Sequence, residues 1–115
     1  MTLGESATLA RIFVSEADHH EGTSLHEWVV RKAREFGLAG ATVLRGVMGY
    51  GESRQVHTNR LVEFSTNQPV VVELVDTPER IAEFLPLLDE AMDHGGLITL
   101  ERVQVHLHRP NQHTP

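Results

Sequence analysis

The chain passes from an apolar strand into a polar loop along Ala39-Gly40-Ala41-Thr42-Val43-Leu44-Arg45-Gly46-Val47-Met48-Gly49-Tyr50-Gly51-Glu52-Ser53-Arg54-Gln55-Val56-His57-Thr58. Four of these residues are glycine, so the backbone here can turn sharply and approach a ligand closely. The polar part carries guanidinium, hydroxyl and imidazole groups, which can hold an anion or a metal. We interpret the stretch as a binding loop that follows a strand. An ordinary strand and turn is the alternative.

The strand of this stretch is expected over residues 41–50. Arg45 shares a face of it with Val43 and Val47, so its guanidinium either reaches water at a sheet edge or points into a binding cleft. Farther along the chain, the composition of residues 61–64 predicts a short strand. We expect this strand to pair back onto the start of the loop.

Further strands and helices are predicted on both sides. Apolar and β-branched runs predict strands, and apolar residues at helical spacing between caps predict helices. The expected elements are a strand over 9–15, a helix between the cap Ser24 and the terminator Gly37, a central strand over 70–75, a helix from the cap Thr77 to His94, and a last strand that includes the alternating run 103–108. Pro86 lies inside the second helix and predicts a kink or a break there.

The order strand, helix, strand, strand, helix, strand predicts an α+β protein with the ferredoxin-like βαββαβ fold. Its four-stranded antiparallel sheet would carry both helices on one face. The other face would be bare unless subunits cover it, which predicts a homo-oligomer. We expect a single domain over residues 1–115, with a loose N-terminus over 1–7 and a disordered tail over 109–115.

Composition excludes several classes of protein. The formal charge of −6 argues against a sequence-independent grip on nucleic acid. No cysteine is present, which excludes disulfides and thiolate chemistry. No apolar run approaches the roughly 20 residues that cross a bilayer, so we expect a cytoplasmic protein. No nucleophile motif, phosphate-loop motif or dinucleotide fingerprint is recognisable, so we expect no enzyme.

The eight histidines raise the question of a metal site. His19 and His20 are neighbours before Glu21, and His57 lies in the other loop. They are weak candidates for metal ligands, because their spacing matches no standard zinc motif; exposed loop histidines are the alternative. His106 and His108 alternate along the last predicted strand, which would place two imidazoles on one sheet face about 7 Å apart. Ordinary surface positions are the alternative for this pair.

Several segments together closely resemble the domain-of-unknown-function 190 family, a PII-like group that is distantly similar to the PII nitrogen-signalling proteins. The resemblance covers roughly residues 9–107. Its segments are Arg11-Ile12-Phe13-Val14-Ser15-Glu16, Ala39-Gly40-Ala41-Thr42-Val43-Leu44-Arg45-Gly46, Met48-Gly49-Tyr50-Gly51, His57-Thr58 and Pro69-Val70-Val71-Val72-Glu73-Leu74-Val75-Asp76. It implies a ferredoxin-like subunit, a homotrimer, and small-molecule effectors bound in the clefts between subunits. In PII proteins such effectors are adenine nucleotides.

The PII binding motifs are matched only in part. Gly49-Tyr50-Gly51 resembles the Gly-Phe-Gly at the base of the PII T-loop, and Arg54-Gln55 resembles its Arg-Gln pair two residues late. His94-Gly95-Gly96-Leu97 stands where PII proteins have a glycine-rich loop with a lysine. His106-Leu107-His108 replaces a C-terminal Arg-x-Arg. Because an imidazole is mostly neutral at pH 7, a monophosphate, another small ligand or no ligand would also fit.

We therefore predict a non-enzymatic, PII-like regulatory protein without a permanent cofactor. An effector, for which an adenine nucleotide is the candidate, would order the loop 51–69, and this loop would contact a protein partner such as a membrane transporter or channel. The predicted ligand-binding residues are Arg45, Gly49, Tyr50, Gly51, Arg54, His57, Gly95, Gly96, His106 and His108. The alternative is a metal-binding module similar to the CutA proteins that uses His19, His20 and His57.

Overall fold

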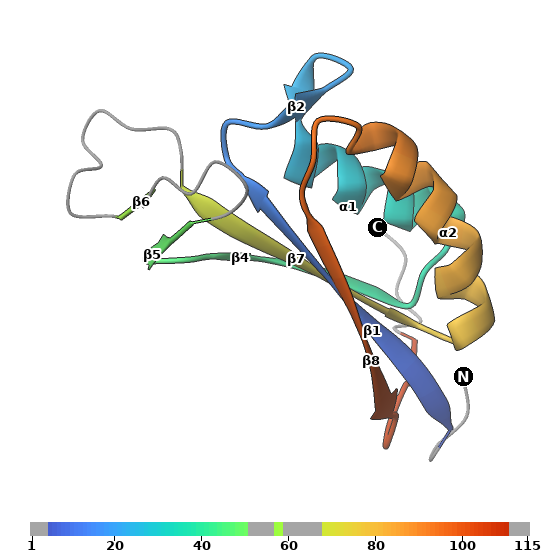
Figure 1. Ribbon diagram of the computed structural model, residues 1–115. Coiled ribbons are helices and arrows are strands. Elements are labelled where there is room, and N and C mark those ends of the chain that lie inside the picture. Colours follow the sequence, from blue (N-terminus) through green and yellow to red (C-terminus); the bar gives the residue numbers. More distant parts are fainter. Residues whose placement is uncertain (1–4, 51–56, 59–67, 111–115) are drawn as a thin grey trace.

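Two helices lie on one face of a four-stranded antiparallel sheet (Figure 1). The computed structural model describes residues 5–50, 57–58 and 68–110. The sheet order is β4-β7-β1-β8, with β1 Ser6–Ser15, β4 Gly40–Arg45, β7 Pro69–Asp76 and β8 Leu97–Gln104. The predicted α+β, ferredoxin-like fold is therefore confirmed, and so is the central position of the apolar run in β7.

Helix α1, Leu25–Phe36, begins and ends where the pattern predicted. Gly37 ends it with a φ of 86°, and its amide donates to the carbonyl groups of Ala33 and Arg34. Ser24 is the residue before the helix, as predicted for the cap, but its side chain makes no cap hydrogen bond. Instead, the Thr23 hydroxyl donates to the Glu27 carboxylate at 3.1 Å.

Helix α2, Pro78–Ala91, starts at the predicted cap. The Thr77 side chain accepts a hydrogen bond from the amide of Arg80 at 3.2 Å. Pro86 does not break the helix, which continues for another turn. The missing amide costs one backbone hydrogen bond, but buried residues on both sides of Pro86 hold the helix to the sheet. They are Ile81, Phe84, Leu88 and Ala91.

The core lies between the helices and the covered face of the sheet. Alternate residues of β7 point into it, as period-two patterning requires: Val70, Val72, Leu74 and Asp76 are buried, while their neighbours are only half-buried. Ile12 from β1 and Phe84 from α2 are among its largest fully buried side chains. The helices therefore leave the other face of the sheet uncovered within one chain.

Two predicted boundaries near the ends of the chain need correction. The N-terminus is not loose at Ser6 and Ala7, because they belong to β1 and pair with Gln104 and Val103. The last strand ends at Gln104, so His106 and His108 do not alternate along it. After Gln104 the chain makes a different contact, in which the amide of Val105 donates to the carbonyl of Glu5 at 2.9 Å. Arg109 and Pro110 have no regular structure, and residues 111–115 lie outside the described part of the chain.

The strand predicted over 41–50 is divided in two. Strand β4 ends at Arg45, and the next residues leave the sheet to form a separate two-stranded ladder of β5 Met48–Gly49 with β6 His57–Thr58. The predicted pairing of residues 61–64 falls outside the described residues. A second small ladder, β2 His19–His20 with β3 Thr23–Ser24, lies between β1 and α1. No described helix is both long and apolar enough to span a membrane.

Candidate functional site

The base of the polar loop is built around Pro69, the first residue of β7. The amide of Gly46 donates to the Pro69 carbonyl at 2.8 Å. A Cβ at Gly46 would lie 3.0 Å from the proline ring, and one at Gly49 would lie 3.5 Å from it. The chain can therefore leave β4 and enter β5 close to the ring because Gly46 has no side chain.

Charged groups lie beside this base. The Arg45 guanidinium at the end of β4 is paired with the carboxylate of Glu16, which follows β1. Arg45 remains more than half exposed, so the pair leaves part of the guanidinium open to an anion. Arg45 thus lies at the end of the edge strand β4, a position that is compatible with both roles that the sequence left open for it.

Gln68 is a residue of the loop base that the sequence did not identify. Only 5% of it is exposed, and neither its amide nitrogen nor its amide oxygen has a hydrogen-bond partner among the described residues. Its backbone is anchored, because the Gln68 carbonyl accepts from the amide of Glu16 at 2.8 Å. A buried amide without partners is rare and costly. No feature of the sequence distinguishes Gln68 from the polar residues of the predicted turn before it.

The loop between α2 and β8 approaches the same end of the sheet. Leu97, at the start of β8, pairs with Phe13 near the end of β1, where β7 begins. Gly95 and Gly96 have φ values of 113° and 144°, which favour glycine. A Cβ on Gly96 would in addition collide with the methyl carbon of Met92. The positive φ values therefore explain this pair of glycines without a ligand.

The predicted ligand-binding residues thus fall into three groups. Arg45, Gly49 and the Gly95-Gly96 pair lie toward the end of the sheet where the loop starts, and exposed Tyr50 is the last described residue before the loop. His57 pairs with Gly49 through the backbone, while Gly51 and Arg54 lie outside the described residues. His106 and His108 follow the opposite end of β8, so within one chain they are separated from the rest.

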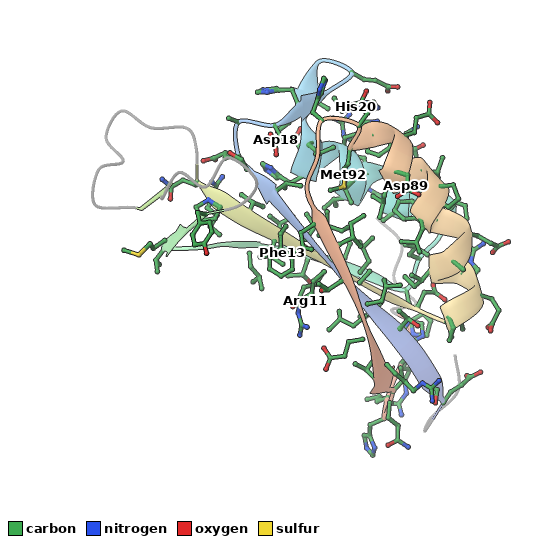
Figure 2. The ribbon with its side chains drawn as sticks, in the orientation of Figure 1. Arg11, Phe13, Asp18, His20, Asp89 and Met92 are labelled. Atoms are coloured by element: carbon green, nitrogen blue, oxygen red, sulfur yellow. The ribbon has the colours of Figure 1, made fainter. Side chains whose placement is uncertain are left out.

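The uncovered sheet face carries a cluster of charged side chains surrounded by apolar ones. Arg11 donates to Glu73 at 3.0 Å and to Glu101 at 2.7 Å, and it lies on the side of the sheet away from the helices (Figure 2). The hydrogen bond to Glu73, followed by the one to Glu101, raises the pKa of the Arg11 guanidinium above its ordinary value. Leucine, valine and phenylalanine side chains share this face, among them the exposed Phe13, Leu44 and Leu97.

The neighbouring histidines His19 and His20 have different partners. His19 donates from Nδ1 to the carbonyl of Ala17 at 2.7 Å. The His20 ring instead lies edge-on to Trp28, with a centroid separation of 4.7 Å. Within residues 5–50, 57–58 and 68–110 no group of three or more histidine, aspartate and glutamate side chains is placed to hold a metal ion.

Comparison with protein families gives one matching family model. Residues 7–105 match DUF190, described as uncharacterized ACR, COG1993. A UPF0166 protein of Aquifex aeolicus is 41% identical over 97 residues, which span 84% of this chain and 90% of the relative. Another UPF0166 protein, from Methanocaldococcus jannaschii, is 34% identical over 100 residues, spanning 87% of this chain and 92% of the relative.

Solved structures share the fold at low sequence identity. A signaling protein described as PII-like, from Thermus thermophilus, matches with a TM-score of 0.66 and 20% identity over 90% of this chain and 93% of its own. CPII, a nitrogen regulatory PII-like protein from Thiomonas intermedia K12 bound to ADP, AMP and bicarbonate, has a TM-score of 0.63 at 15% identity, covering 90% and 91%. The divalent ion tolerance protein CutA1 from Ehrlichia chaffeensis has a TM-score of 0.52 at 10% identity, covering 96% and 89%.

Proposed function

The chain belongs to the DUF190 family, and we propose that it is a non-enzymatic, PII-like regulatory protein whose small effector binds between the subunits of a homotrimer. The effector is an adenine nucleotide. The loop 51–69 contacts a protein partner, for which a membrane transporter or channel is the candidate.

The observation that carries this proposal is the position of the loop base at the rim of an uncovered, largely apolar sheet face. Exposed apolar surface of this kind marks a protein–protein contact. A second copy placed on this face would lie near the end of the sheet at which β4 ends with Arg45 and the Gly95-Gly96 turn leads into β8. The resulting cleft would combine the Arg45 guanidinium, the glycine backbone of the Gly95-Gly96 turn and side chains of the neighbouring copy. These side chains could include His106 and His108, which lie far from Arg45 within one chain.

The adenine nucleotide is supported by the structural neighbour CPII, which binds ADP and AMP. Calorimetric titration of the protein with AMP, ADP and ATP tests this choice, with guanine nucleotides as the control for base recognition. We expect saturable binding of at least one adenine nucleotide, and sedimentation of the protein as a trimer. Absence of heat with all three would overturn the nucleotide proposal, whereas a monomer at all concentrations would overturn the inter-subunit cleft.

Gln68→Met tests whether the Gln68 amide, which has no hydrogen-bond partner in the described part of the chain, serves the effector. Methionine has a similar shape without the two polar groups, so the variant should be more stable than the parent by about 1 kcal/mol in urea unfolding without ligand. Affinity for the effector should fall by about tenfold, because a hydrogen-bonding side chain at the loop base is lost. The exposed Asp89 on α2, replaced by asparagine, is the control and should change neither quantity. If Gln68→Met binds the effector with unchanged affinity, the Gln68 amide has no role in effector binding.

The metal-binding alternative gains no specific observation. His19 and His20 are engaged separately, and the likeness to CutA1 at 10% identity concerns the fold alone. Metal analysis of protein prepared without chelators distinguishes the two functions, since a metal module should retain about one ion per subunit.

A further inference from the structure

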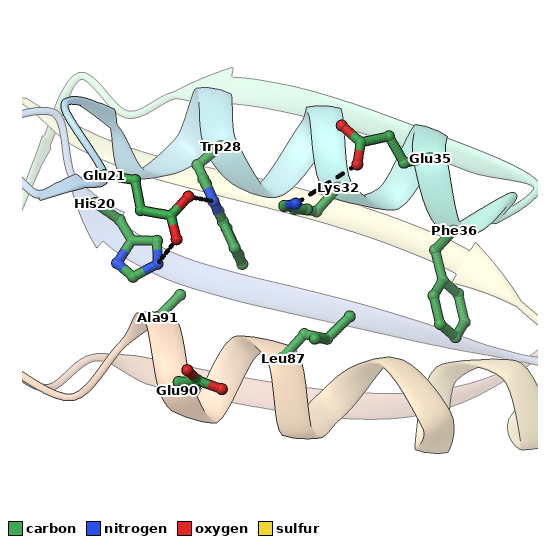
Figure 3. Close-up of a pocket in the computed structure, with 9 residues that line it drawn as sticks. All are labelled: His20, Glu21, Trp28, Lys32, Glu35, Phe36, Leu87, Glu90 and Ala91. Atoms are coloured by element: carbon green, nitrogen blue, oxygen red, sulfur yellow. Dashed lines mark hydrogen bonds and ion pairs between the residues drawn. The ribbon is translucent and has the colours of Figure 1, made fainter.

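A cavity of about 360 Å³ opens on the helix layer, between α1 and the second half of α2 (Figure 3). The β2–β3 hairpin closes one end of it through His20 and Glu21. Leu87 from α2 and Phe36 from α1 contribute apolar wall. This layer is opposite the uncovered sheet face, so the cavity remains accessible when a second copy covers that face. Its size is at the lower end of the range for small-molecule sites.

Trp28 is held in a fixed orientation in this cavity. Only 8% of the residue is exposed, its indole N–H donates to Glu21 at 3.3 Å, and the His20 ring lies edge-on to it. Glu21 reaches the indole from a two-residue turn in which it and Gly22 both have positive φ, 51° and 80°. A side chain in this conformation is uncommon outside glycine, and here it places the carboxylate on the indole.

A cation already lies over the indole ring. The Lys32 ammonium is 5.8 Å from the ring centroid, within the range of a cation–π contact, and 3.5 Å from the Glu35 carboxylate. The combination of an aromatic face with a neighbouring carboxylate is the chemistry that recognises ammonium ions. The chain's own lysine thus occupies a position that suits an ammonium group.

The lining charges leave room for a second cation. Glu21, Glu35 and Glu90 supply three carboxylates, against the ammonium of Lys32 and the imidazole of His20, whose Nε2 lies 3.6 Å from the Glu21 carboxylate. Glu90 reaches the cavity from α2 and makes no ion pair or hydrogen bond with another described residue. The cavity therefore combines an aromatic floor, an apolar wall and an excess of negative charge.

We propose that this cavity binds a small organic ammonium ion with a short aliphatic body. The cationic head lies near Trp28 and the carboxylates, where it competes with Lys32, and the aliphatic part contacts Leu87 and Phe36. This site is separate from the effector cleft of the proposed function and does not depend on it.

Trp28 is the only tryptophan of the chain, so its fluorescence reports on this cavity alone. The whole protein is titrated with n-butylammonium and with tetramethylammonium, up to about 50 mM because affinities near millimolar are expected for such small ligands. Neutral n-butanol and anionic butyrate are the controls. A saturable change with either ammonium ion, but with neither control, supports the site. A stronger response to tetramethylammonium assigns recognition to the aromatic face, and a stronger response to n-butylammonium assigns it to hydrogen bonds with carboxylates. No saturable change with either ion, or an equal change with n-butanol, overturns the proposal.

Three variants test the charges. Glu90→Gln should weaken ammonium binding by about threefold to tenfold, since it removes the unpaired carboxylate. Lys32→Gln should strengthen binding several-fold, because it removes the competing ammonium. Asp89→Asn changes the adjacent acid of α2, which does not line the cavity, and should leave binding unchanged. Equal effects of Glu90→Gln and Asp89→Asn would show that the response reflects overall charge, and would overturn the site.

Discussion

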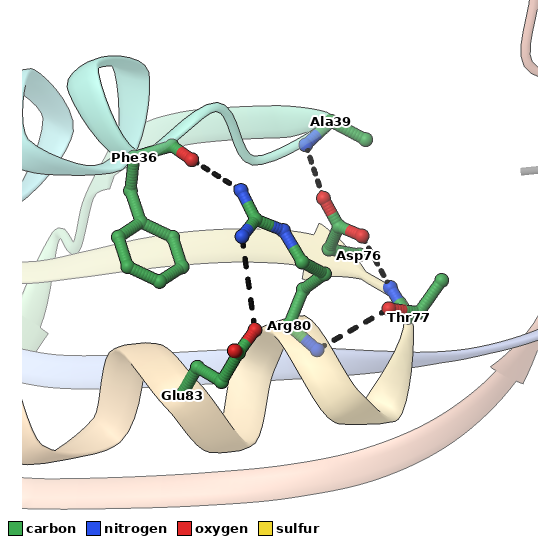
Figure 4. A network of polar contacts seen from close by, with 6 residues as sticks. All are labelled: Phe36, Ala39, Asp76, Thr77, Arg80 and Glu83. Atoms are coloured by element: carbon green, nitrogen blue, oxygen red, sulfur yellow. Dashed lines mark hydrogen bonds and ion pairs between the residues drawn. The ribbon is translucent and has the colours of Figure 1, made fainter.

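Replacement of Asp76 by alanine is expected to lower the free energy of unfolding by about 3 kcal/mol. The Asp76 residue is 7% exposed, and its two carboxylate oxygens accept hydrogen bonds from two backbone amides. One oxygen accepts from Ala39 at 2.8 Å and the other from Thr77 at 2.6 Å (Figure 4). Alanine would leave both amides without these acceptors, and each part-buried donor left unpaired costs about 1–3 kcal/mol.

The size of this effect follows from what Asp76 connects. It ends β7, and its two partners lie just before β4 and at the start of α2. Next to it, Arg80 donates to the carbonyl of Phe36 at the end of α1 and lies 4.4 Å from the Phe36 ring centroid. One region thus joins two helices to two strands of the sheet.

Urea unfolding at a fixed protein concentration measures the prediction. Asp76→Asn should lose less stability than Asp76→Ala, because the amide keeps one acceptor oxygen. Glu79→Gln, an exposed acid in the first turn of α2, is the control and should change stability by less than about 0.5 kcal/mol. If Asp76→Ala lowered the free energy of unfolding no more than Glu79→Gln, the hydrogen bonds of Asp76 would contribute nothing to the stability of the fold.

Phe13→Asp is expected to abolish the proposed trimer without unfolding the subunit. Phe13 is 37% exposed on the uncovered sheet face, close to Leu97 and Val71 in the neighbouring strands. If a second copy covers this face, the variant buries an unpaired carboxylate, whose desolvation costs several kcal/mol per subunit. Sedimentation at several concentrations should show trimers for the parent and monomers for the variant, while circular dichroism remains that of a folded α+β protein.

Leu87→Asp is the matched control for this experiment. Leu87 has the same exposed fraction, 37%, but lies on the helix layer. The same change of chemistry should therefore leave the assembly intact. If Phe13→Asp remains trimeric, the subunit contact lies on another surface. If both variants dissociate, part of the contact lies on α2.

The order and type of the elements could be predicted because the signals for them are local. Gly37 ends α1 and Thr77 with Pro78 starts α2, each through contacts with residues only a few positions away. Likewise, the apolar run of β7 predicted a central strand, and β7 lies between β4 and β1 in the sheet. The combination of these elements already specified the ferredoxin-like fold, and with it the end of the sheet where the polar loop starts.

The details of the candidate sites were decided by contacts between distant residues. The predicted long strand ends at Arg45 because Gly46 meets Pro69, which lies far along the chain, beyond the polar loop. Trp28 is a buried residue of α1, but its cavity forms only because Glu21 and α2 lie against it. Gln68 carried no signal, since the partners of a side-chain amide depend on which residues fold against it; among the described residues it has none. Periodicity thus determined which face of each element is buried, whereas the tertiary structure decided which polar groups are paired and which remain available to a ligand.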